Sequence, residues 1–234
     1  MGGGFPLFLA LLIVLGAFAL VGLMFLIITY GAGVSVRRWE KFTKENGLDF
    51  ENDIKDVVGR YSNHITFFRR GKTRSFCGAL KKDVNEETVY FIDYYYTTGS
   101  LRNRHSHFFT VVLIEGPRCT FPHFFARKQR FLTDSIRKFW QEQDISYSED
   151  REFSKSLFLR GADEQKTREF FNQQQIRSVL SDCIATNNVE IETCDGAVVF
   201  AFSSPRGLKH YFKHTKTALQ VFEMFRVRSE QQEV

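Results

Sequence analysis

The sequence has few of the residue patterns that carry known chemistry. None of its four cysteines lies in a Cys-x-x-Cys pair or at a spacing typical of a zinc site. Ser181 and the Ser203-Ser204 pair lack the surroundings of a hydrolase nucleophile. Residues 97–100, TTGS, precede a predicted strand, whereas a phosphate-binding loop leads into a helix. We therefore expect no cofactor, and nothing supports nucleophilic catalysis.

Charge is absent from residues 5–30, FPLFLALLIVLGAFALVGLMFLIITY. This run is longer than the roughly 20 residues that a helix needs to cross a bilayer. A cleaved signal peptide would have a basic segment before a shorter apolar run, and no basic residue precedes this one. The run predicts a single N-terminal transmembrane helix.

Basic residues stand on only one side of this run. Arg37, Arg38 and Lys41 follow it closely, and such residues stay on the cytoplasmic side of a membrane. Tyr30 and Trp39 have the amphipathic rings that gather at the membrane interface. The pattern predicts a single-pass protein of the plasma membrane, in contact with the lipid bilayer, whose soluble region is cytoplasmic.

The remaining chain is organised as a short helix, one folded region and a tail. Residues 31–47 continue as a juxtamembrane helix, residues 48–227 form an α+β region, and residues 228–234 form a loose tail. A sub-boundary would fall near residues 143–152, although the composition changes little there.

Strand patterns dominate the first half of the folded region. The segments HITFFR, TRSFCGAL, ETVYFIDYYYT and HSHFFTVVLIEG are rich in β-branched and aromatic residues, and turns separate them. They predict four strands in meander order, the last two forming a long antiparallel hairpin. Further along the chain, Asp195-Gly196 between apolar runs predicts a second hairpin, with positive φ at both turn residues.

Helical patterns lie mainly in the second half. Residues 127–142, 163–171 and 208–227 have apolar stripes, and Asn172 is the expected N-cap of another helix. Residues 153–159 alternate as a strand does. The order of elements predicts an α+β fold, in which a transmembrane helix precedes a mainly antiparallel sheet with packed helices.

Three residues suggest a metal site. His105 and His107 project from one face of their predicted strand, and Asp93 lies on the neighbouring strand. A carboxylate and two imidazoles would suit a metal-dependent hydrolase. The other interpretation is that the histidines are solvated strand-end residues and that Asp93 is a buried carboxylate with a structural partner.

Two turns are basic. If both hairpins point the same way, their side chains form one edge that would meet anionic lipid headgroups or a protein partner. Nucleic acid is disfavoured because the aromatic residues follow strand patterning and match no RNA-binding motif. The residues of this edge are Arg69, Arg70, Lys72, Arg74, Arg102 and Arg104.

Three stretches resemble a family of uncharacterised bacterial membrane-anchored proteins with an α+β soluble domain. They are FIDYYYTTGSLRNRHSHFFTVVLIE, FSKSLFLRGADEQKTREFFNQQ and VEIETCDGAVVFAF. The resemblance implies the topology and no activity. Two functional hypotheses remain: a membrane-tethered, non-enzymatic binding or scaffold module, and the metal-dependent hydrolase. The sequence does not indicate an oligomeric state.

Overall fold

The computed structural model of the chain describes residues 37–51, 54–100, 102–129, 145–203 and 207–232. The chain divides into two compact units, Met1–Gly47 and Leu48–Val234. In the first unit residues 37–46 are helical. The second unit contains the sheet and all other elements described below.

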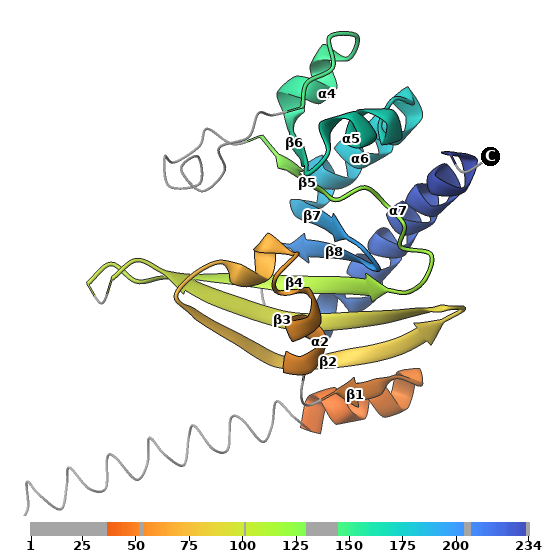
Figure 1. Ribbon diagram of the computed structural model, residues 1–234. Helices are drawn as coiled ribbons and strands as arrows, with labels where there is room; N and C mark the ends of the chain where they lie inside the picture. Colours follow the sequence, from red (N-terminus) through yellow and green to blue (C-terminus); the bar gives the residue numbers. More distant parts are fainter. Residues whose placement is uncertain (1–36, 52–53, 101, 130–144, 204–206, 233–234) are drawn as a thin grey trace, which may run out of the picture. The chain divides into compact units, whose positions relative to one another are not determined.

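One eight-stranded sheet organises the second unit (Figure 1). Its spatial order is β1-β2-β3-β4-β8-β7-β5-β6, and every neighbouring pair is antiparallel. The sheet continues past the predicted sub-boundary near residues 143–152, because β6 pairs with β5. The strands are β1 (Asp49–Glu51), β2 (Thr73–Val84), β3 (Glu87–Thr98), β4 (His105–Glu115), β5 (Phe124–Lys128), β6 (Leu157–Gly161), β7 (Val189–Cys194) and β8 (Ala197–Phe202).

Short helices connect the strands, and a long one ends the chain. Asp163 caps α5 by accepting a hydrogen bond from the backbone N–H of Lys166, as an acidic N-cap residue does. The helices are α2 (Lys55–Tyr61), η1 (Thr66–Arg69), α4 (Arg151–Ser156), α5 (Glu164–Phe170), α6 (Gln174–Asn187), η2 (Leu208–His210) and α7 (Tyr211–Gln232).

The fold prediction is corrected in its membrane part. Among the residues that the structure describes, no helix combines the length and the apolar composition that crossing a bilayer demands. The predicted span, residues 5–30, lies outside the described residues. The structure supports an α+β fold with a large antiparallel sheet, and the part of the chain that it describes includes no transmembrane helix.

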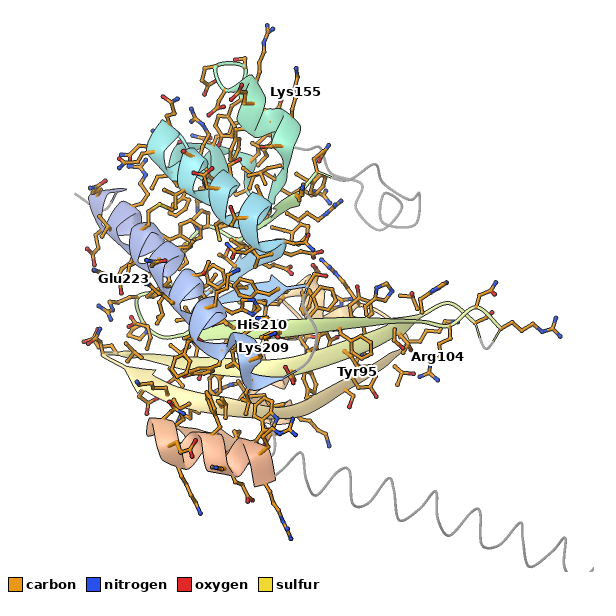
Figure 2. The ribbon with its side chains drawn as sticks, turned by 180° about the vertical axis from the view of Figure 1, so that it is seen from behind. Tyr95, Arg104, Lys155, Lys209, His210 and Glu223 are labelled. Carbon is orange, nitrogen blue, oxygen red and sulfur yellow. The ribbon has the colours of Figure 1, made fainter. Side chains whose placement is uncertain are left out.

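Both faces of the central strands are covered, which explains their nearly continuous apolar sequences. In β3, Tyr90, Ile92 and Tyr94 face α2 and η1 in one buried cluster. The alternate residue Phe91 contacts Tyr211 of α7, with ring centroids 5.0 Å apart. Helices α2 and η1 therefore cover one face of the sheet, the α2 face, and α7 covers the other, the α7 face (Figures 1 and 2).

A cluster of phenylalanine rings fastens the second half of the unit together. Phe225 of α7 is fully buried, and its ring lies 5.6 Å from that of Phe124 in β5 and 5.5 Å from that of Phe170 in α5. Most of these ring pairs are edge-to-face, the arrangement that the aromatic quadrupole favours. The phenylalanine cluster consists of Phe121, Phe124, Phe170, Phe171, Phe222 and Phe225.

Several local predictions were wrong. Thr66–Arg69, expected in a strand, form the 3-10 helix η1. The predicted strand 153–159 is divided between α4 and β6. The predicted helix 127–142 begins inside β5, and residues 130–144 lie outside the described residues. Residues 66–69 and 153–159 are short segments, so contacts with distant residues decide their conformation more than local patterns do.

Both predicted hairpins are present. β3 and β4 pair in continuous register from Thr88↔Glu115 to Thr98↔His105. β7 and β8 pair around Asp195 and Gly196. Among the non-glycine residues described, only Asn85 and Asn188 have positive φ. The predicted positive φ at Asp195 is therefore wrong. Of the two turn residues, Gly196 has a positive φ, at 75°.

Candidate binding surface

Two basic turns meet at one end of the sheet. The backbone N–H of Lys72 donates to the carbonyl of Thr97 at 2.9 Å, which places the turn before β2 against the end of β3. At the same end, Thr98 pairs with His105, so the loop connecting β3 and β4 begins there. The register thus brings both basic turns to the same end, a point that the sequence had left open.

The β3–β4 hairpin extends beyond β8, the strand that pairs with β4 on the side away from β3. β8 ends with Phe202 opposite Thr110, so residues 105–109 of β4 project past it (Figure 2). Gly99 allows the chain to turn, since its φ is 86° and a Cβ there would lie 1.9 Å from the carbonyl oxygen of Asn103. No L side chain fits at this position without rebuilding the loop.

Four cations at this end have no ion-pair partner among the described residues. Arg69, Lys72, Arg102 and Arg104 are exposed, and none of them forms an ion pair with any residue that the structure describes. We call these four residues the basic sheet end. None of these four side chains is therefore paired directly with a carboxylate of the described residues.

The opposite end of the same strands is balanced. Arg118 forms a bidentate pair with Glu87, a carboxylate that is almost fully buried. Arg60 donates to both carboxylate oxygens of Glu115 at 3.0 Å. This contrast gives the β2–β4 region a positive end and a neutralised end, which is the pattern that steers anions to one place.

Two of the six predicted edge residues have structural roles. Arg70 forms an ion pair with Glu190, and its guanidinium stacks 5.1 Å from the Phe67 ring and 5.3 Å from the Phe125 ring. Arg70 therefore holds η1 against β7 and β5 and is removed from the binding edge. Arg74 is exposed and donates to the carbonyl of Phe68 at 3.0 Å, so one of its nitrogens is occupied by η1.

An exposed ring on the β3–β4 hairpin was not apparent from the sequence. Phe108 is 41% exposed on the projecting part of β4, and its centroid lies 5.9 Å from that of Tyr95. Strand patterning alone did not single out Phe108. It did not show that β8 ends before reaching this residue.

The structure does not bring Asp93 together with the two histidines. Asp93 pairs with Thr110 and His107 pairs with Tyr96, three positions away, so their side chains lie on opposite faces of the sheet. Asp93 is buried on the α7 face, where its Oδ2 accepts a hydrogen bond from the N–H of Gly207 at 3.0 Å. The buried, hydrogen-bonded carboxylate fits the structural interpretation.

His107 belongs to the α2 face. Its ring stacks on Tyr96 with centroids 4.9 Å apart, and its Nε2 lies 2.9 Å from Thr98 Oγ1. Burial, and then the nearby His105, lower the pKa of His107. The described ranges contain no group of three or more His, Cys, Asp and Glu residues arranged to hold a metal ion.

His214 is buried on α7. Its ring is 4.1 Å from that of Phe202 and nearly parallel to it, and His210 stacks 5.3 Å away. Burial, with His210 and Lys213 adding to it, lowers the pKa of His214 to about 4. His214 is therefore neutral in the folded protein near neutral pH.

We expect acid to destabilise the fold through His214. Its pKa falls from about 6.5 in the unfolded chain to about 4 in the folded protein, so between these values the unfolded state binds more protons. Stability is therefore fully present above the unfolded pKa and decreases as the pH falls from 6.5 toward 4. Urea denaturation at pH 7.5 and 5.0 should show a smaller loss for His214→Phe than for the wild type. An equal loss in both proteins would contradict this role, and substitution of exposed His64 serves as the control.

The residues predicted to lie at a membrane interface are only partly described. Tyr30 is outside the described residues, and Arg37, Arg38 and Lys41 are exposed. Trp39 is 5% exposed, so its ring has little surface to offer an interface.

No family model, curated protein or solved structure matches this chain. The resemblance to bacterial membrane-anchored proteins therefore stays a prediction.

Proposed function

We propose that this protein is a non-enzymatic binding module whose basic sheet end docks an acidic segment of a protein partner. The proposal keeps the binding module predicted from the sequence and omits its transmembrane anchor. A metal-dependent hydrolase is not proposed, because Asp93 and His107 lie on opposite faces of the sheet.

The observation that carries the proposal is the contrast between the two ends of β2, β3 and β4. At one end the carboxylates Glu87 and Glu115 are neutralised by arginines. At the other end the four cations of the basic sheet end have no carboxylate partner among the described residues. Uncompensated charges of one sign accelerate encounter with the opposite charge and select against partners of the same sign.

The projecting hairpin adds shape to this charge. Arg102 and Arg104 lie on a loop that extends past β8 (Figure 2), so a partner reaches them without displacing other elements. Exposed Phe108 provides an apolar contact on the same hairpin. Arginine and aromatic residues are the types that most often contribute binding energy at protein interfaces.

Binding of labelled poly-L-glutamate to the full chain, followed by fluorescence anisotropy, tests the proposal. We expect saturable binding at low ionic strength that weakens steeply as NaCl rises past about 0.1 M, where the screening length is about 10 Å. Sedimentation with phosphatidylcholine vesicles, with and without phosphatidylserine, is the parallel assay. Binding to phosphatidylserine vesicles without binding to poly-L-glutamate would favour lipid headgroups and overturn the choice of partner, and binding to neither would overturn the proposal.

A further inference from the structure

The outer edge of β2 is open beside the basic sheet end. β2 pairs with β3 along its length, but on its other side β1 pairs only with Ala79–Lys81. Along Thr73–Phe76 no strand in the described part of the chain pairs with that outer side. Unpaired backbone N–H and C=O groups on such an edge are a template for another strand.

A bulge separates the open segment from the segment that β1 covers. The β2–β3 register shifts between Phe76 and Ala79, and Gly78 within the shift has a φ of 112°. A Cβ on Gly78 would lie 3.1 Å from the ring of Phe50 in β1, so the bulge and β1 fit closely together. The open edge is thus a distinct stretch of four residues, about 13 Å long at the usual rise of a strand.

Basic residues surround this stretch. Arg74 lies within it, Lys72 precedes it directly, and Arg69 is the last residue of η1 before it; all three are exposed. None forms an ion pair with a described residue. Positive charge on an edge opposes pairing with a second copy of the same edge, which is a common protection of edge strands. The same charge attracts an acidic strand.

We infer that the acidic segment of the partner binds as an added β-strand along Thr73–Phe76 of β2. This inference rests on the proposed function and names how its partner is held. The ladder hydrogen bonds of the added strand would provide affinity, and its alternate side chains would provide selectivity. Because side chains alternate between the faces, an acidic residue at every second position would share a face with Arg74.

An acidic peptide can pair with both the cations and the unpaired backbone groups of this edge, whereas a lipid headgroup can pair only with the cations. Lipid headgroups neutralise the cations, but they bring no row of backbone donors and acceptors. An extended peptide brings both the charges and the backbone groups. Like-charge repulsion at Lys72 and Arg74 disfavours a second copy of this chain as the occupant.

The test compares two peptides of equal charge. One is acetyl-(Thr-Glu)4-amide, whose alternating β-branched residues favour an extended strand. The other is the same peptide with the backbone nitrogen of every residue methylated, which keeps the side chains and charges and removes the N–H donor of each residue. With the full chain at low ionic strength, we expect the unmethylated peptide to bind at least about tenfold more tightly, a difference of about 1.4 kcal/mol.

Hydrogen–deuterium exchange on the full chain locates the contact. The unmethylated peptide should slow amide exchange in Thr73–Phe76, and the methylated peptide should not. Equal affinity of the two peptides, without protection of Thr73–Phe76, would overturn strand addition while leaving the proposed function in place. Binding of neither peptide, together with no binding of poly-L-glutamate, would overturn both.

Discussion

Replacing Phe225 with alanine should lower the free energy of unfolding by about 4 kcal/mol. The Phe225 ring is fully buried, and it contacts rings from the β4–β5 connection, β5 and α5. Removing it leaves a cavity where several elements meet, and it also breaks the edge-to-face pairs that each contribute about 0.5–1.5 kcal/mol. Urea denaturation at pH 7.5 measures the change.

Two variants on the same helix control this experiment. Phe225→Leu keeps most of the volume and should cost less than half as much, since volume-conserving changes are tolerated best. Phe212→Ala removes the same side chain from a position that is 61% exposed, and it should change stability by about 0.5 kcal/mol or less. Similar losses for Phe212→Ala and Phe225→Ala would contradict the role assigned to the phenylalanine cluster.

The second large effect is expected at Glu192, which is 2% exposed in β7. Its carboxylate accepts hydrogen bonds from the backbone N–H of Thr66 at 2.7 Å, from Thr66 Oγ1 at 2.7 Å and from the backbone N–H of Phe67 at 2.9 Å. It therefore satisfies the first donors of η1, which have no partner within that short helix. Burial raises the pKa of Glu192, and the three donors oppose this by stabilising the charged form.

Glu192→Ala should lower the free energy of unfolding by about 3 kcal/mol, because the buried donors of Thr66 and Phe67 lose their acceptor. Glu192→Gln keeps one acceptor oxygen in the same place and should cost roughly half as much. In both thermal and urea denaturation, stability should increase from Glu192→Ala to Glu192→Gln to the wild type. A Glu192→Ala protein as stable as the wild type would mean that η1 forms without this anchor.

Local and long-range contacts explain why part of the fold could be predicted from the sequence and part could not. The β3–β4 hairpin depends on two long runs that favour strands, and Asp195-Gly196 marks a turn within a few residues. Such information is local, so the sequence shows it directly. The conformation of Thr66–Arg69 depends instead on Glu192, more than 120 residues away in the chain.

The candidate surface also has features that the local sequence shows and features that depend on distant residues. The basic turns are visible in the sequence, but whether they meet was left open, because it depends on the strand register that the structure supplies. Arg70 is held away from the surface by its contacts with Glu190 in β7 and Phe125 in β5. Both strands are distant from Arg70 in the sequence, so local patterns do not reveal these contacts. Whether Asp93 and His107 share a face of the sheet depends on the register of β3 and β4. A shift of one position would move a side chain to the other face. Closeness in the sequence does not determine this register.

The most direct test of the central claim is the affinity of poly-L-glutamate for a protein without the basic sheet end. In the test variant Arg69, Lys72, Arg102 and Arg104 are all replaced by glutamine. In the matched control the exposed residues Lys128, Arg151, Lys155 and Lys166 are replaced by glutamine, which removes the same formal charge elsewhere.

Measured by anisotropy at low ionic strength, the dissociation constant should rise at least about tenfold in the test variant. In the matched control it should rise by about twofold or less, because those charges lie away from the site and are screened. Equal weakening in the two variants would show that net charge alone governs binding, and it would contradict the assignment of the basic sheet end as the binding surface.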